Sequence, residues 1–263
     1  WYMNQTSGGF YQQGFGQNGD KAVAADYDGD GRTDAAVYRS GTWFRTRSST
    51  GTYDTAIFGI PGDLPAPADF DGDNKADVAV FRPSTGQWFT LNSSNGGFSV
   101  VNFGVSGDVP MAADYDGDRR ADIAVFRPST GTWYRLNSSG GFVVHQFGAP
   151  GDKAVSGDFD GDGKADLAVW RPSNGNWYIL GSSNLYTVTT FGVAGDIPAP
   201  ESSSIVPNIF ISLGSSNTPN VPVLGLKLLT TSPISVESEA NTACLFFNSP
   251  VGLIDIFAST PSK

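Results

Sequence analysis

Short hydrophobic runs separated by turn residues make up most of the chain, and residues 109–147 show the pattern clearly. The runs in this unit are VPMAADY (109–115), DIAVFR (122–127), TWYRLN (132–137) and FVVHQF (142–147). Turn residues follow the second and third runs, as Pro128-Ser129-Thr130-Gly131 and Ser138-Ser139-Gly140-Gly141. Apolar residues do not recur at helical spacing here. The pattern therefore predicts four short antiparallel strands.

The same unit recurs along the chain with a period of about 44 residues. A nine-residue acidic loop begins at Asp26, Asp69, Asp114 and Asp158, in steps of 43, 45 and 44 residues. Four other markers keep this period: Trp at 1, 43, 88, 133 and 177, Arg at 39, 82, 127 and 171, Phe-Gly at 15–16, 58–59, 103–104, 147–148 and 191–192, and Gly-Asp at 19–20, 62–63, 107–108, 151–152 and 195–196. Four strands in a unit of this length are the signature of a β-propeller blade. We expect the repeated Trp to pack within the blades and the repeated Gly-Asp to cap turns.

These residues resemble a known family, the FG-GAP/VCBS repeats of integrin-α-like β-propellers. The run Phe147-Gly148-Ala149-Pro150-Gly151 nearly spells the family's name motif, and each acidic loop is similar to its calcium loop. The resemblance covers residues 1 to about 200. It implies a calcium-binding propeller of the extracellular space. WD40 repeats have a similar period, but their Gly-His and Trp-Asp marks are missing here.

Each acidic loop carries Asp at its first, third, fifth and ninth positions. The four loops are DYDGDGRTD (26–34), DFDGDNKAD (69–77), DYDGDRRAD (114–122) and DFDGDGKAD (158–166). In an EF-hand, positions 1, 3 and 5 bind Ca²⁺ through side chains and position 7 binds it through its carbonyl. We therefore expect about four Ca²⁺ ions, one per loop, with these ligands: Asp26, Asp28, Asp30, Arg32 and Asp34; Asp69, Asp71, Asp73, Lys75 and Asp77; Asp114, Asp116, Asp118, Arg120 and Asp122; Asp158, Asp160, Asp162, Lys164 and Asp166.

The alternatives to a calcium loop account for less of the pattern. Plain acidic surface turns explain Asp and Gly, but not the same Asp spacing in four copies. Magnesium prefers to keep water ligands, and zinc favours His or Cys, of which the chain has one each. The EF-hand itself does not fit, because Val37 and its equivalents replace the position-12 Glu. Position 6 requires a left-handed backbone and is Gly31, Asn74, Arg119 or Gly163, so the site at Arg119 is expected to be the weakest.

Charge and composition narrow the class of protein further. The net charge of −10 argues against nucleic-acid and anionic membrane partners. No apolar segment approaches membrane-spanning length. The single Cys244 excludes an internal disulfide framework. Because the chain begins at Trp1 without a signal peptide, we expect a processed or trimmed form.

The two ends of the repeat array are complementary. The chain begins with third- and fourth-strand sequence (residues 1–15), whereas residues 195–217 supply a first and a second strand after the last full unit. We expect them to complete one composite blade, giving about five blades, with strand exchange between chains as the alternative. The predicted propeller spans residues 1–217. Residues 218–263 form a β-rich extension that serves in packing or oligomerisation.

The sequence offers little for catalysis, and we expect that the chain is not an enzyme. Its only imidazole, His145, lies in mid-strand. We expect a secreted or cell-surface scaffold for adhesion or assembly, with a protein or glycan partner and self-association through the chain ends. The alternatives are a propeller lectin and an accessory module of a larger secreted enzyme. Sequons at Asn4, Asn92 and Asn137 occupy equivalent turns and carry glycans only in a cell that glycosylates secreted proteins.

Overall fold

The computed structural model describes residues 14–196 and 198 in full, and six further strands by their backbone alone. Those six strands are β1 (Tyr2–Asn4), β2 (Phe10–Gln12), β19 (Ile209–Leu213), β20 (Leu224–Leu228), β21 (Ser235–Glu239) and β22 (Thr242–Phe246). The described part of the chain contains strands and turns but no helix, and hence no helix that could cross a membrane.

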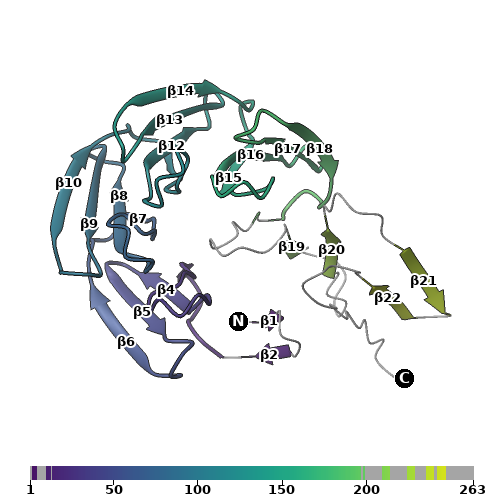
Figure 1. The fold of residues 1–263 in the computed structure, drawn as a ribbon, viewed down its shortest axis with the longest axis horizontal. Coiled ribbons are helices and arrows are strands. Elements are labelled where there is room, and N and C mark those ends of the chain that lie inside the picture. The colour runs from purple at the N-terminus through teal and green to yellow at the C-terminus, as the bar shows by residue number, and fades with distance from the viewer. Residues whose placement is uncertain are drawn as a thin grey trace. The chain divides into compact units, whose positions relative to one another are not determined.

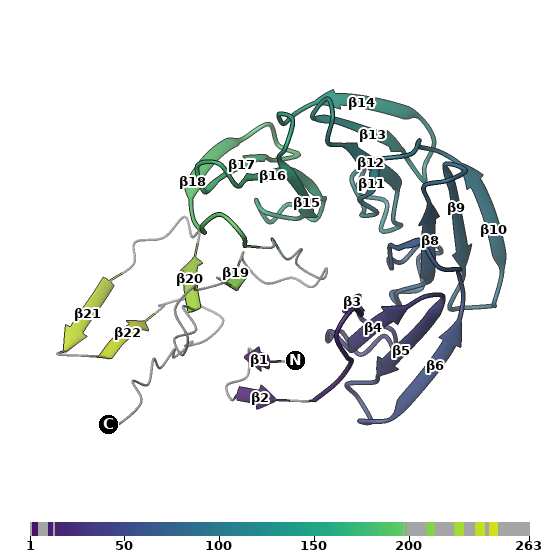
Figure 2. The same ribbon diagram turned by 180° about the vertical axis from the view of Figure 1, so that it is seen from behind.

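Four successive four-stranded antiparallel sheets form the blades, and they follow one another in chain order (Figure 1). Their strands are β3 (Lys21–Ala22), β4 (Ala35–Arg39), β5 (Thr42–Thr46) and β6 (Tyr53–Ile57) in blade 1; β7 (Leu64–Pro65), β8 (Val78–Arg82), β9 (Gln87–Leu91) and β10 (Phe98–Asn102) in blade 2; β11 (Val109–Pro110), β12 (Ile123–Arg127), β13 (Thr132–Leu136) and β14 (Phe142–Gln146) in blade 3; and β15 (Lys153–Gly157), β16 (Asp166–Arg171), β17 (Asn176–Leu180) and β18 (Tyr186–Thr190) in blade 4. In each blade the first strand is innermost and the fourth is outermost (Figure 2). The predicted all-β propeller with four-stranded blades is confirmed.

The acidic loop is the connection between the first and second strands of each blade. In blade 3, β11 pairs with β12 at Val109↔Phe126, and an isolated bridge joins Ala113 to Asp122. Between these points the Met111 N–H donates to the Ala124 carbonyl at 2.8 Å. The first strand therefore runs alongside the second over the predicted range and leads into the acidic loop.

The repeated Trp packs inside the blades, as expected. Trp88 on β9 is fully buried against Phe81 and Phe70. Its indole N–H donates to the carbonyl of Phe103, the Phe of the next Phe-Gly pair, at 3.0 Å. The equivalent bonds join Trp43 to Phe58, Trp133 to Phe147 and Trp177 to Phe191. The Phe carbonyl of each Phe-Gly pair therefore accepts a hydrogen bond from the indole N–H of the Trp in the same blade.

The repeated Gly-Asp caps a turn and also forms an ion pair that the sequence analysis did not predict. Asp63 Oδ2 accepts the Ile60 N–H at 2.9 Å, which confirms the cap. The same carboxylate receives Arg82 Nε and Nη2 at 2.8 and 2.9 Å. Equivalent pairs are Arg39–Asp20, Arg127–Asp108 and Arg171–Asp152. The repeated Arg and the Asp of the repeated Gly-Asp therefore form an ion pair in each of the four blades.

The predicted composite blade lies largely outside the described residues. Strands β1 and β2 form the expected antiparallel hairpin, with Tyr2 opposite Gln12. Strand β19 lies within the predicted second strand and pairs with β20, with Ile209 opposite Leu228. The closure itself and the division into 1–217 and 218–263 remain predictions.

Candidate metal centres

Each acidic loop gathers three carboxylates at one point. Carboxylate oxygen atoms of the Asp residues at loop positions 1, 3 and 9 lie within 4.8 Å of one another in every loop. The triads are Asp26–Asp28–Asp34, Asp69–Asp71–Asp77, Asp114–Asp116–Asp122 and Asp158–Asp160–Asp166. These twelve predicted ligands are thus brought together in four equivalent clusters, each able to hold a cation.

Backbone N–H groups fold the loop around its first Asp. Asp26 Oδ1 accepts the Gly29 N–H at 2.6 Å and Oδ2 accepts the Gly31 N–H at 2.8 Å. The ninth residue, Asp34, accepts the Tyr27 N–H at 2.8 Å. Both ends of the loop are thereby fixed, so that the carboxylates face each other.

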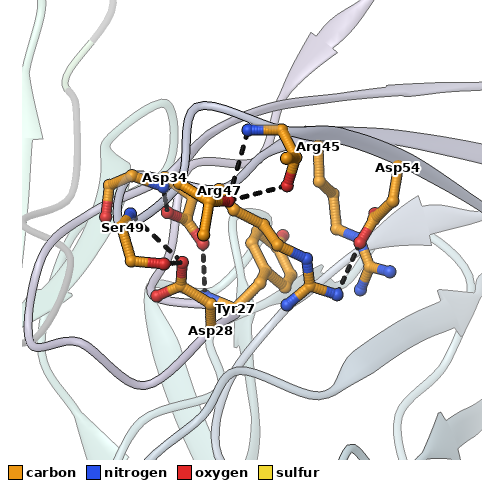
Figure 3. Close-up of polar contacts among 10 residues, drawn as sticks. Tyr27, Asp28, Asp34, Arg45, Arg47, Ser49 and Asp54 are labelled. Atoms are coloured by element: carbon orange, nitrogen blue, oxygen red, sulfur yellow. Dashed lines mark hydrogen bonds and ion pairs between the residues drawn. The ribbon is translucent and has the colours of Figure 1, made fainter.

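A pair of serines in the turn between the third and fourth strands completes the site, and the sequence analysis missed it. In blade 1, the Ser49 hydroxyl donates to Asp28 at 2.6 Å (Figure 3). The Ser48 N–H donates to Asp34 at 2.6 Å. The equivalent pairs are Ser93–Ser94, Ser138–Ser139 and Ser182–Ser183. Their period matches that of the loops, which was the available signal. Two of these pairs lie within the sequons at Asn92 and Asn137.

The fifth and seventh positions are placed differently from the triads. Asp30 accepts the Arg32 N–H at 2.9 Å and the Ser48 hydroxyl at 2.9 Å, so its carboxylate braces the loop. The same bracing recurs at Asp73, Asp118 and Asp162. Ligation by these Asp residues and by the position-7 carbonyls remains a prediction.

Burial makes the ninth Asp costly to ionise without a partner charge. Asp34, Asp77, Asp122 and Asp166 are at most 1% exposed. Loss of solvent raises the pKa of the first three, and it raises the pKa of Asp166 to about 6. A nearby cation acts in the opposite direction, because it favours the ionised carboxylate. The triads therefore have the electrostatics of cation sites.

Two carboxylate oxygens at position 3 provide the most direct test of fit. Asp71 Oδ1 and Asp160 Oδ1 are buried and have no hydrogen-bond partner among the described residues. A buried, unpaired carboxylate oxygen is expensive. Both belong to triads, where a cation would satisfy them. The donor set consists of oxygen alone, which suits a hard cation.

Neighbouring loops are joined to each other. The Ala76 N–H of loop 2 donates to the Asp26 carbonyl of loop 1 at 2.6 Å, and Ala121 and Ala165 repeat this bond to Asp69 and Asp114. In addition, Arg120 Nη2 donates to the Asp71 carbonyl at 2.8 Å. Each loop therefore supports the backbone of the loop before it.

Position 6 is left-handed in all four loops, as expected. The φ angles are 79° at Gly31, 64° at Asn74, 69° at Arg119 and 87° at Gly163. Arg119 is exposed, so its strain is not offset by burial of its side chain. Arg119→Gly should raise the melting temperature by about 2–4 °C, because the left-handed backbone costs a non-glycine residue about 1 kcal/mol.

Thermal unfolding of this variant in calcium, followed by circular dichroism, measures the effect. The matched control is Asn74→Gly, whose gain should be smaller because Asn tolerates this conformation. A lower melting temperature for Arg119→Gly, or a larger gain for the control, would contradict the assignment of strain.

Solved structures share this fold at low sequence identity. Virginiamycin B lyase from Staphylococcus aureus is 10% identical, with a TM-score of 0.51 over 93% of this chain and 83% of that one. A streptogramin B lyase is also 10% identical, with a TM-score of 0.50 over 93% and 82%. An Agrocybe aegerita lectin specific for non-reducing terminal N-acetylglucosamine is 19% identical, with a TM-score of 0.45 over 64% and 50%. No curated protein sequence matches the chain.

These neighbours correct one expectation. The prediction that the chain is not an enzyme is overturned, because a propeller of this fold carries a lyase activity. The prediction relied on the shortage of nucleophile–base pairs around His145. The shortage of such pairs therefore does not exclude catalysis on this fold.

Models of the FG-GAP repeat match the chain across the last three of the four blades. An FG-GAP-like repeat matches residues 69–125 and again 114–169, and an FG-GAP repeat matches residues 150–189. These segments contain three of the four acidic loops and their serine turns. The chain therefore contains FG-GAP repeats, which occupy residues 69–189 of its β-propeller.

Proposed function

We propose that this chain is a calcium-stabilised propeller that acts outside the cell as a binding scaffold for a protein or a glycan. The observation that carries the proposal is the fourfold Asp triad, with its unpaired buried oxygens at Asp71 and Asp160. Calcium accepts six to eight oxygen ligands in flexible geometry. Magnesium keeps more of its water, and zinc favours nitrogen and sulfur ligands.

The Asp residues at positions 1, 3 and 9 of each loop would hold the ion. Its charge offsets the mutual repulsion of three carboxylates and removes the cost of burying the ninth one. The serine turn then keeps the Asp at position 3 in place, because the hydroxyl of its second serine donates to that carboxylate. The ion thereby ties the first hairpin of a blade to its outer turn.

Asp71→Ala should lower the calcium stoichiometry from four to three. Each triad draws its ligands from its own loop, so loss of one carboxylate disables one site. Titration calorimetry and native mass spectrometry measure the count. Asp54→Ala, which lies outside the loops, is the control and should keep four. A fall of more than one ion would show that the links between loops make the sites interdependent.

An extracellular location follows from the expected affinity. FG-GAP repeats are typical of extracellular proteins, and loops of this kind in extracellular modules bind calcium at roughly 10⁻⁴–10⁻³ M. The outer strands also offer apolar contact area: Tyr53, Phe98, Phe142 and Tyr186 are 55–61% exposed at equivalent positions. Such a repeated aromatic row suits a partner that contacts several blades.

The binding role is tested with the labelled propeller on intact cells of its own organism and on a glycan array. We expect saturable binding in millimolar calcium that is lost in EGTA. Competition by a free saccharide would identify the glycan class and favour the lectin alternative. Absence of binding to both surfaces, or binding that ignores calcium, would overturn the scaffold proposal.

A further inference from the structure

A small cleft with an excess of basic residues lies between blades 3 and 4. Its volume is about 140 Å³, and its polar lining includes Tyr115, Arg135, His145, Lys164, Ser182 and Asn184. Asp166 is the single acidic residue in the lining, and it belongs to the fourth metal triad. A cleft with this balance of charge is unexpected in a chain of net charge −10.

In blade 1, the arginine on the third strand has an aspartate opposite it on the fourth strand. Arg45 on β5 lies directly opposite Asp54 on β6. Its Nε donates to Asp54 Oδ1 at 2.7 Å, and its guanidinium lies over the Tyr27 ring at 5.2 Å (Figure 3). The stacked guanidinium therefore presents its edge to a carboxylate on the neighbouring strand.

Blade 3 keeps the arginine but lacks the acid. Arg135 on β13 is equivalent to Arg45, and its guanidinium lies over the Tyr115 ring at 4.9 Å. The residue opposite it on β14 is Val143. Arg135 Nε is buried and has no hydrogen-bond partner among the described residues. A buried guanidinium N–H without an acceptor is costly, and the cleft lies beside it.

We propose that this cleft binds the carboxylate of a small organic acid, which takes the place that Asp54 fills in blade 1. A hydrogen bond between a guanidinium and a carboxylate is charge-assisted and therefore strong. In blade 1 Asp54 accepts such bonds from Arg45 Nε and Arg47 Nη2, and the buried Arg135 Nε is the blade-3 equivalent of the first donor. Lys164 and His145 also line the cleft and add further donors.

The size of the cleft limits what enters it. Its volume equals that of about five water molecules, so it admits the carboxylate and the few atoms next to it. The remainder of the ligand extends toward solvent, where Asn184 offers hydrogen bonds. A uronic acid is a suitable probe, since it joins a carboxylate to hydroxyl groups. The site rests on the proposed binding role and specifies one ligand class for it.

The test is calorimetric titration of the calcium-loaded full chain with sodium glucuronate, with glucose, acetate and phosphate as parallel ligands. We expect one glucuronate per chain, weaker binding of acetate and none of glucose. Equal binding of glucose would overturn the proposal, as would phosphate binding in the absence of carboxylate binding. Failure of every ligand to bind, with four calcium ions still present, would overturn this site and leave the calcium proposal intact.

Two variants in blade 3 and one in blade 1 locate the site. Val143→Asp supplies the missing acid from within the blade and should weaken glucuronate binding at least about tenfold, as should Arg135→Gln, which removes the charge. Arg45→Gln alters the equivalent arginine of blade 1 and should leave binding unchanged. Each variant must retain the calcium stoichiometry and a cooperative melt. Unchanged binding in both blade-3 variants would contradict the assignment.

Discussion

Removal of calcium should lower the melting temperature of this chain by about 10 °C or more. A ligand at a hundredfold excess over its dissociation constant stabilises the folded state by about 2.7 kcal/mol per site. In a domain of this size each kcal/mol moves the melting temperature by about 2–4 °C. About 10 mM calcium gives about half of that stabilisation per site if the dissociation constant is about 10⁻³ M, and four triads then reach about 10 °C. Differential scanning calorimetry in about 10 mM calcium and in EGTA measures the shift.

The matched control for this experiment replaces position 3 of every loop, as Asp28→Asn, Asp71→Asn, Asp116→Asn and Asp160→Asn together. This variant keeps the shape of the four side chains and removes one charge from each triad. It should melt at the same temperature in calcium and in EGTA. Identical melting of the unaltered chain in the two buffers would refute the assignment of the triads as calcium sites.

Asp108→Ala should destabilise the chain by about 3 kcal/mol. The Asp108 side chain is fully buried, and it accepts Arg127 Nε and Nη2 at 2.7 and 2.9 Å and the Val105 N–H at 2.9 Å. Its removal leaves Nε and Nη2 of Arg127 and the Val105 N–H without the acceptor that they share. Partial exposure of Arg127, at 27%, keeps the cost at the lower end of the range for a buried pair.

Denaturant unfolding in calcium measures this effect, and Asp54→Ala is its control. Asp54 also pairs with arginines, but it is 29% exposed, so its loss should cost less than about 1 kcal/mol. The double variant Asp108→Leu with Arg127→Met should recover part of the loss, because no charge is then left unpaired. A cost for Asp108→Ala no larger than that of the control would contradict the structural role of the pair.

The period and the acidic loops were enough to predict the blades and the residues of the triads. Strands such as β12 (Ile123–Arg127) fall within one residue of their predicted bounds. A repeat identifies equivalent residues, but it does not show which of them meet. Asp108 and Arg127 were both recognised as periodic, yet their pairing follows from the register of β11 on β12, which sets Val109 opposite Phe126. That register depends on the loop geometry between them.

The roles within the site show the same limit. Asp30 was predicted to bind the ion by analogy with an EF-hand, and this stays a prediction. The sequence did not show that its carboxylate accepts the Ser48 hydroxyl from a turn in another part of the blade. The serine turn lies about 20 residues from the loop in sequence, so only the closed blade brings the two together. Arg119 was the exception, because its left-handed backbone is a local property that its place in the loop already determined.

The bond between successive loops bears on how such a chain changes in length over evolution. Each unit carries a donor at the eighth loop position and an acceptor at the first, as in Ala121 N–H to the Asp69 carbonyl. Both groups belong to the backbone, so they are present in every copy whatever its side chains. A duplicated unit inserted in register therefore brings both the donor and the acceptor of this bond. When a unit is deleted, the units on either side can form the same bond with each other. Gain or loss of whole blades leaves every junction intact, whereas gain or loss of part of a blade breaks two.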